Sequence, residues 1–323
     1  MILRSLLRHT LLRRAFSLTA LAFAGGVAAV LLPLTLLVRG RPARFAAFAG
    51  AYVAAELSGL TCAARLDTRD EEAHYALLTR LLARLFRSGS RAFGLRVLPP
   101  EQGLEFPEGP LLVFSRHAGP GDSFLLVYAL LAVARRRPRI VLKETLALDP
   151  MIDVVLGRTP NCFVGRGKAR RAEAADRIGE LAATLGARDA LLLFPEGGNF
   201  TTARRARQIS RLRRRRDRRV LPTARSLRHV LPAQPAGVFA AVDAAPPGSH
   251  AVFVAHTGLD RLESVADVWH AVPLRRPVQV AWWAVPVGLI PDGEQERLAW
   301  LDGQWARIDA WIDPERRGRE AIG

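Results

Sequence analysis

The sequence predicts an α/β fold, with a mostly parallel central sheet flanked by helices and preceded by two apolar helices at the N-terminus. Short apolar runs alternate with longer segments of helical periodicity, which is the pattern of a parallel sheet buried on both faces. The expected strands are 111–115, 139–143, 161–165, 190–194, 251–257 and 278–287. The expected helices of the α/β region are 70–94, 123–134, 168–187 and 294–312.

Length and composition limit the class of protein. The chain has 323 residues, of which 50% are hydrophobic, so one large core can form. A formal net charge of +17 predicts an acidic partner, such as an anionic membrane, a phosphorylated ligand or nucleic acid. The two cysteines, Cys62 and Cys162, are too few and too far apart for a disulfide framework or a cysteine-based metal site.

Two apolar segments at the N-terminus indicate a membrane-associated protein. Residues 15–38 carry no charge over 24 positions and follow several arginines, while residues 45–64 are interrupted only by Glu56. The first is long enough to cross a bilayer, and its length favours a retained anchor over a cleaved signal peptide. We expect residues 1–68 to form an anchor, spanning or lying in the interface, and residues 69–323 to form the α/β domain.

The candidate catalytic pair, His117 and Asp122, lies where the strand 111–115 gives way to a helix. Ligand sites of open α/β sheets gather at such strand ends. The intervening Gly119 and Gly121 allow a sharp turn that returns Asp122 towards His117. A carboxylate on one imidazole nitrogen leaves the other free to accept a proton from a hydroxyl. The alternative is that Asp122 only caps the following helix.

A second candidate segment, Phe194-Pro195-Glu196-Gly197-Gly198, also follows an apolar strand directly. Glycines at this position bring backbone N–H groups close to a ligand, and Glu196 is placed to orient it. The same four letters at 106–109 come before a strand, so we interpret that copy as a turn.

Two basic residues, Lys143 and Arg166, follow neighbouring strands of the expected sheet. If the strands are parallel, both lie at the same edge as His117 and Glu196. An arginine binds phosphate through two parallel hydrogen bonds, so Arg166 is a candidate phosphate ligand with Lys143 assisting. The alternative for each is a solvated surface charge.

In this order, the blocks at His117–Asp122, Lys143-Glu144, Gly165-Arg166 and 194–197 resemble the PlsC-like 1-acylglycerol-3-phosphate acyltransferases over roughly residues 70–290. The resemblance implies that His117 and Asp122 are catalytic, and that Arg166 and the segment of Glu196, Gly197 and Gly198 bind the acceptor. It also implies acyl-CoA or acyl-carrier protein as the donor. The chain departs from the family at Arg116, where asparagine is usual.

The resemblance implies acyl transfer to the free hydroxyl of a lysophospholipid, most often 1-acylglycerol-3-phosphate, with no metal or redox cofactor. The location that follows is the cell membrane, with the catalytic domain facing the cytoplasm. The alternatives are another acceptor, such as glycerol 3-phosphate, and a membrane-anchored basic binding protein without catalysis.

An arginine-rich segment at 203–228 is expected to form a loop. Residues 204–228 hold 12 arginines and one acid, Asp217. Such a run binds anionic lipid or nucleic acid, or steers an acidic donor. We favour lipid and expect no nucleic acid, because the run has no interleaved aromatic residues.

Overall fold

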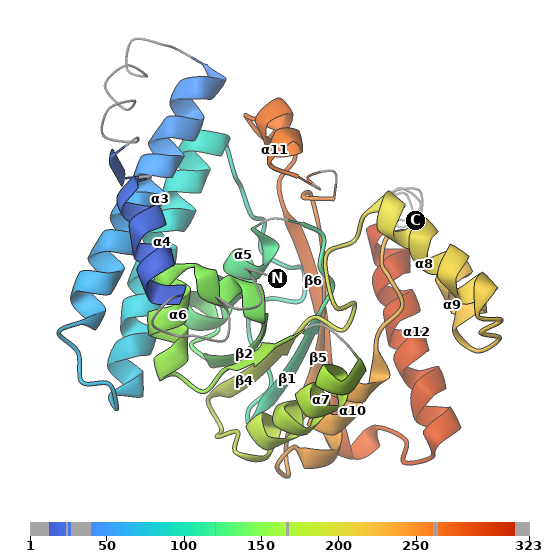
Figure 1. Cartoon of the computed structure of the whole chain (residues 1–323). Coiled ribbons are helices and arrows are strands. Elements are labelled where there is room, and N and C mark those ends of the chain that lie inside the picture. The colour runs from blue at the N-terminus through green and yellow to red at the C-terminus, as the bar shows by residue number, and fades with distance from the viewer. Residues whose placement is uncertain are drawn as a thin grey trace.

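A six-stranded sheet organises the computed structural model, with strand order β3-β2-β4-β1-β5-β6 (Figure 1). The structure describes residues 13–23, 25–26, 40–119, 121–165, 168–260, 262 and 264–313, without the side chains of 168–171. The strands are β1 Leu111–Ser115, β2 Arg137–Lys143, β3 Cys162–Val164, β4 Asp189–Leu193, β5 His250–Thr257 and β6 Gln279–Pro286. The first five are mutually parallel and β6 pairs antiparallel with β5, which confirms the predicted fold class.

The sheet is buried on both faces because its central strands, β1 and β4, are apolar at four of their five positions, the exceptions being Ser115 and Asp189. Every residue of β1 and of β4 is buried. Alternate side chains of β1 enter different cores: Leu111 and Val113 join one cluster, while Leu112 and Phe114 join the other. The parallel register brings the carboxyl ends of β1, β2 and β4 to one edge, where the candidate residues follow.

One face of the sheet is covered by four helices. They are α3 Arg41–Ala63, α4 Glu71–Phe93, α5 Asp122–Tyr128 and α6 Pro150–Val155, with α5 continued by the π-helical turn Ala129–Val133. The predicted helix 70–94 is thus α4. Its N-cap is Asp70, whose side chain accepts the Ala73 N–H, and its C-cap is Gly94 in the left-handed conformation.

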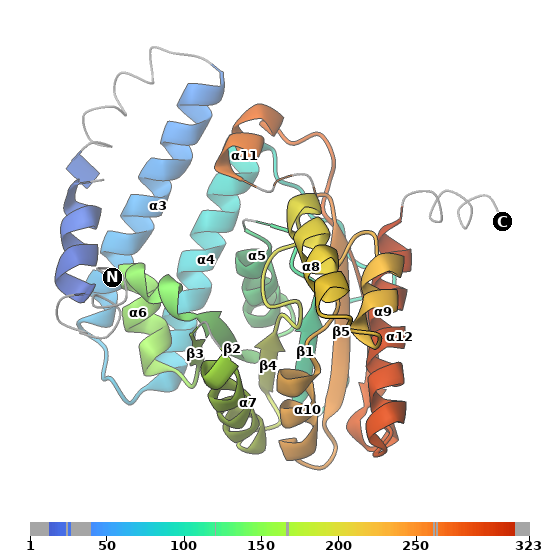
Figure 2. The ribbon, with the colours of Figure 1, turned by 45° about the vertical axis from the view of Figure 1, so that its right-hand side comes forward.

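The opposite face is covered by α7 Lys168–Ala183, α10 Pro235–Ala244 and α12 Glu294–Ile312 (Figure 2). Trp305 of α12 is fully buried, and its indole N–H donates to the Leu231 carbonyl at 2.9 Å. Helix α11 Val265–Ala271 stands at the carboxyl edge of the sheet, and short 3-10 turns occupy Glu144–Leu148, Leu156–Arg158 and Val287–Leu289.

The predicted apolar segment 15–38 is described only over 15–23 and 25–26, and these residues are helical. Arg13 and Arg14 both pair with Asp153 of α6, at 2.5 and 2.9 Å. The second predicted segment, 45–64, lies within α3. Among the described residues, α3 is the one helix long and apolar enough to cross a membrane, judged by length and composition.

The expected loop at 203–228 is largely helical, which corrects that prediction. It forms α8 Thr202–Arg214 and α9 Val220–Ser226. Arginine is a good helix former, and the Thr201 hydroxyl caps α8 by accepting the Arg204 N–H. The three arginines in the last turn of α8 lie at the negative end of the helix dipole. A high density of arginine in this segment therefore does not indicate a loop.

Candidate active site

His117 and Asp122 are in contact at the end of β1. The His117 Nδ1 lies 2.9 Å from the Asp122 carboxylate. Because Nδ1 faces Asp122 and His117 lines the main cavity, its Nε2 is the ring nitrogen available to a ligand. The His117 side chain is 17% exposed and that of Asp122 is 2% exposed, so the imidazole reaches the cavity while the carboxylate is buried.

The Asp122 carboxylate is held by the loop that precedes it. Its Oδ2 accepts the N–H groups of Ala118 at 2.7 Å and Gly119 at 3.3 Å. Burial raises the pKa of Asp122, but the hydrogen bond and charge of His117 outweigh burial and bring the pKa below its ordinary value. Asp122 is the first residue of α5, and no side-chain hydrogen bond caps that helix. The carboxylate therefore serves the histidine loop and not the helix end.

Glycine is required in this loop at two positions. A Cβ on Gly119 would lie 2.4 Å from the Leu262 carbonyl oxygen, and Gly121 has a φ of 94°. Any side chain at Gly119 would push the loop away from residues 259–262 and separate His117 from Asp122.

A buried arginine supports the loop from behind. Arg116 is 1% exposed, and its guanidinium donates to the carbonyls of His256 at 2.8 Å and His229 at 3.1 Å and pairs with Asp260. This arrangement ties the end of β1 to the end of β5. Burial raises the pKa of Asp260, and the adjacent Arg116 more than compensates, bringing it to about 2.

A second histidine lies against the back of Asp122. The His256 Nε2 is 3.6 Å from Asp122 Oδ2 and 3.3 Å from the Arg116 carbonyl oxygen. Burial and the nearby Arg116 charge lower the pKa of His256 to about 4, so this ring is neutral at pH 7. A neutral imidazole has one N–H, and Nε2 must carry it, because Nε2 is the nitrogen within hydrogen-bonding distance of the Arg116 carbonyl oxygen.

Glu196 lies behind the loop, and its carboxylate is directed at backbone groups. Its two oxygens accept the His117 N–H at 2.9 Å and the Leu231 N–H at 2.7 Å. Burial raises the pKa of Glu196 to about 7. Glu196 is thus beside the His117–Asp122 pair, in a position that fixes the His117 backbone and the chain near Leu231.

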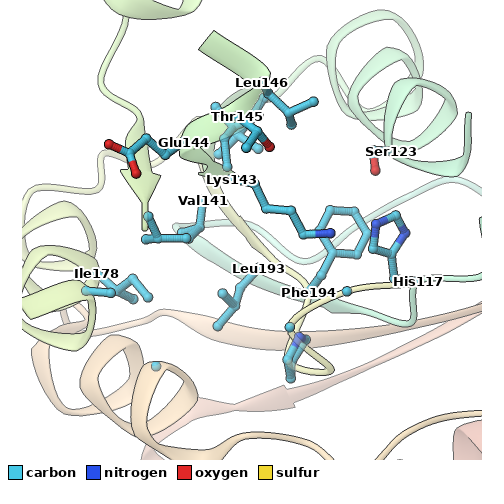
Figure 3. A pocket seen from close by; sticks show the side chains of 18 of the residues that line it. His117, Ser123, Val141, Lys143, Glu144, Thr145, Leu146, Ile178, Leu193 and Phe194 are labelled. Atoms are coloured by element: carbon cyan, nitrogen blue, oxygen red, sulfur yellow. The ribbon is translucent and has the colours of Figure 1, made fainter. Parts of the chain in front are cut away.

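Three more of the predicted residues, Lys143, Gly197 and Gly198, line a cavity of about 1110 Å³ together with His117. Figure 3 shows the Lys143 side chain extending towards the rings of His117 and Phe194. Those two rings pack with their centroids 4.8 Å apart. Arg166 lies outside the described residues. Among the residues that are described, no three His, Cys, Asp or Glu side chains gather closely enough to hold a metal ion.

The cavity reaches both faces of the sheet. Leu82, Ile152 and Leu156 line it from the α3–α6 side, and Ile178 and Leu193 line it from the α7–α10 side. Its volume exceeds the roughly 300–1,000 Å³ usual for small-molecule pockets. A hydroxyl placed at His117 therefore has apolar space in two directions.

The acyltransferase family model matches residues 86–250, just over half of the chain. The chain belongs to the acyltransferase family. This acyltransferase is an enzyme in which the matched region runs from the end of α4 to the start of β5 and contains the whole His117–Asp122 loop and the Glu196 block.

The acyltransferase is also similar to a solved structure, the 1-acyl-sn-glycerophosphate (LPA) acyltransferase PlsC from Thermotoga maritima. The similarity covers 97% of this chain and 95% of that chain, with a TM-score of 0.45 and 14% sequence identity. No curated protein sequence matches the chain.

Sequence reasoning missed the residues behind the pair, Arg116, His256 and Asp260, as contributors to the site. One of them had a usable signal. His256 is the second-last residue of the predicted strand 251–257, and the strand-end rule that selected His117 places it at the same edge. Arg116 had no such signal, because an arginine is rarely buried and its carbonyl partners come from backbone distant in the sequence.

Proposed function

We propose that this acyltransferase moves a fatty acyl group from a thioester donor to the free hydroxyl of a lysophospholipid, most simply 1-acylglycerol-3-phosphate, giving phosphatidic acid. The observation that carries the proposal is the His117–Asp122 pair beside a cavity that extends along both faces of the sheet. Two acylated substrates meeting at one base need apolar space in two directions, which this cavity provides.

In the proposed reaction His117 is the general base and no acyl-enzyme forms. The His117 Nε2 takes the proton of the acceptor hydroxyl as its oxygen bonds to the thioester carbonyl carbon. The tetrahedral intermediate then expels the thiolate, which takes the proton from the His117 imidazolium. Asp122 holds the Nδ1–H tautomer and stabilises the imidazolium. The products are the new ester and a free thiol, and the mechanism uses no metal.

The acceptor phosphate is proposed to lie on the basic side of the cavity. Lys143 and Arg204 both line it, and the Arg204 guanidinium is held by the Asn199 carbonyl at 3.0 Å. The turn at Gly197 and Gly198 packs closely against Gln234, because a Cβ on Gly197 would lie 2.2 Å from the Gln234 amide nitrogen. Arg166 remains a proposed phosphate ligand. Glu196 is proposed to act through the backbone of His117.

An acyl-transfer assay with purified enzyme in detergent tests the proposal. With 1-acylglycerol-3-phosphate and a C16 thioester donor, His117→Ala should lower kcat by about 10²–10⁴-fold, the usual contribution of a general base. Asp122→Asn should lower kcat on the order of 10³-fold or more. The uncharged amide does not stabilise an imidazolium, and its single oxygen cannot accept both the Ala118 N–H and the His117 Nδ1–H. The exposed His270→Ala serves as the control and should retain full activity.

Acceptors with other head groups, and glycerol 3-phosphate, belong in the same assay. Higher kcat/KM with one of these would replace the proposed acceptor and leave the mechanism standing. Full activity of His117→Ala would contradict the mechanism. Inactivity of the wild-type enzyme with every acceptor and donor would favour a non-catalytic binding protein.

A further inference from the structure

The arginine surface is a strip of exposed side chains on and after α8. Its members are Arg207, Arg211, Arg213, Arg214, Arg215, Arg216, Arg218 and Arg219, all exposed. No residue of α8 is buried, and within the described part of the chain none of these arginines pairs with a carboxylate. A helix of 13 residues spans ~20 Å at 1.5 Å per residue, so the positive charge forms an extended strip.

The arginine surface is fixed to the active site at its near end. The Phe200 N–H, just before α8, donates to the His117 carbonyl at 2.6 Å. Arg204, in the first turn of α8, lines the cavity. On its inner side, Arg205 donates to the carbonyls of Leu227 at 2.6 Å and Arg225 at 2.9 Å, which clamps α8 to α9. A partner bound to this strip is therefore held beside the cavity mouth.

The composition of this surface distinguishes a protein partner from a bilayer. Ile209 and Leu212 are half-buried, and no large apolar side chain is exposed between 202 and 226. A helix that inserts at a lipid interface presents Trp, Phe or Leu opposite its basic face. The chain has such residues elsewhere: Phe16, Leu18 and Phe23 are at least 49% exposed.

The two kinds of surface also lie on different sides of the molecule. Figures 1 and 2 both place α3 and residues 13–23 on one side of the sheet, and α8 and α9 on the other, beside α12. A flat bilayer against α3 would leave the arginine surface facing water. The strip is thus available to a soluble acidic partner.

We propose that the arginine surface docks the acyl donor in the form of an acidic acyl-carrier protein. The inference rests on the proposed function and chooses between its two donor classes. A coenzyme carries its few phosphates close together and would engage only two or three arginines. A folded acidic protein covers about 800 Å² in a typical interface, which is broad enough to contact arginines along the whole ~20 Å of α8. Positive charge around the mouth also raises the rate of encounter.

The test compares two triple variants with equal loss of charge. Arg207→Gln, Arg211→Gln and Arg214→Gln remove one stripe of α8, at spacings of four and three residues. The control, Arg80→Gln, Arg84→Gln and Arg87→Gln, removes the same charge at the same spacing from exposed positions on α4. Glutamine keeps the helix propensity. The measurement is kcat/KM with a C16 acyl chain, carried either by acyl-carrier protein or by coenzyme A.

With acyl-carrier protein, the α8 variant should lose at least about tenfold in kcat/KM, chiefly through the association rate. The wild-type kcat/KM for this donor should fall steeply with salt, and that dependence should flatten in the α8 variant. With acyl-coenzyme A, the variant should remain within about threefold of wild type, as should the α4 control with both donors.

Equal losses with both donors, or no loss with the carrier protein, would overturn the proposal. The proposal would also be overturned, in favour of a lipid-binding surface, if the α8 variant kept its kcat/KM with acyl-carrier protein but no longer sedimented with phosphatidylglycerol vesicles. Binding of the acyl-carrier protein, followed by fluorescence anisotropy, separates this inference from the proposed function. If the enzyme is inactive with every acceptor yet binds the carrier protein through α8, the docking surface stands and the proposed reaction fails.

Discussion

At the scale of single residues, the geometry of the site depends on buried polar side chains. Each of them is either uncharged or paired with a group of opposite charge. His256 donates from Nε2 to the Arg116 carbonyl oxygen and lies 3.6 Å from the Asp122 carboxylate while remaining uncharged. A second positive charge beside Arg116 would compete for the Asp122 carboxylate that His117 needs. We therefore interpret His256 as a positioning residue that holds Asp122 without taking a proton.

Because His256 is buried in its neutral form, the free energy of unfolding should decrease at low pH. The unfolded chain protonates His256 below about pH 6.5, whereas the folded protein does so only near pH 4. Between these values the unfolded state binds more protons, so the free energy of unfolding falls as the pH falls. His256→Gln keeps a donor at the Nε2 position and does not titrate. Its loss of stability from pH 7.5 to pH 5 should be smaller than that of the wild type by about 2 kcal/mol.

Denaturant unfolding at constant detergent measures this difference at the two pH values. Glu196 titrates in both proteins, and its raised pKa favours stability at the lower pH, so its contribution cancels in the comparison. Parallel pH profiles for wild type and His256→Gln would show that His256 is not buried in the neutral form.

The residue scale also shows how far the sequence alone could go. The strand-end rule located His117, Glu196 and Lys143, because parallel strands bring their carboxyl ends to one edge. It could not give the direction of each side chain. Glu196 follows its strand as predicted, yet its oxygens accept the N–H groups of His117 and Leu231. That orientation depends on the segment after α9, whose path no local pattern encodes.

At the scale of elements, α3 belongs to the same packed core as the catalytic domain. The Glu56 carboxylate accepts the Met151 N–H of α6 at 3.1 Å, and Ala55 and Ala63 join the core cluster of α4 and the sheet. Gly59 is the point of closest approach: a Cβ there would lie 2.9 Å from Leu81 and 3.2 Å from Met151. The predicted division at residue 68 remains a prediction about folding, and this contact gives a way to test it.

Gly59→Ala should destabilise the protein, although alanine is the better helix former. Overpacking against Leu81 and Met151 should cost about 1–3 kcal/mol and outweigh the gain in propensity. The matched control is Gly303→Ala in α12, where a Cβ would meet nothing within 4 Å. That change should stabilise the protein by about 0.5–1 kcal/mol. Opposite shifts of the thermal midpoint are the expected result. A stabilising Gly59→Ala would show that α3 moves independently of α4 and α6.

Elements differed in how well the sequence predicted them. The core strands and α4 were predicted closely, because continuous apolar runs and an apolar stripe reflect burial directly. Helix α8 was missed, since it buries no residue and so has no apolar periodicity. Helix α6 was missed because six residues are too few to show a period. The antiparallel direction of β6 was also not predicted, since pairing direction depends on chain connection and not on strand composition.

At the scale of the whole molecule, packing favours an interfacial position for α3 over a spanning one. Helix α4 runs beside α3, with Gly59 against Leu81, and a Cβ on Gly89 would lie 3.7 Å from the Phe48 ring. Between these levels α4 carries Arg84 and Arg87, both exposed. A spanning α3 would bring these charges near the middle of the bilayer, at about 2.5–3.5 kcal/mol each. We therefore expect α3 to lie along the membrane surface.

Cysteine labelling at the two ends of α3 tests this orientation. Pro42→Cys and Arg65→Cys, each made with Cys62→Ser, place thiols at exposed positions ~35 Å apart along the helix. Cys162 is buried and should give little background. In sealed vesicles with the enzyme on the outside, a membrane-impermeant maleimide should label both positions equally, because neither end crosses the bilayer. Labelling of one end, with the other reacting only after detergent is added, would show that α3 spans the membrane.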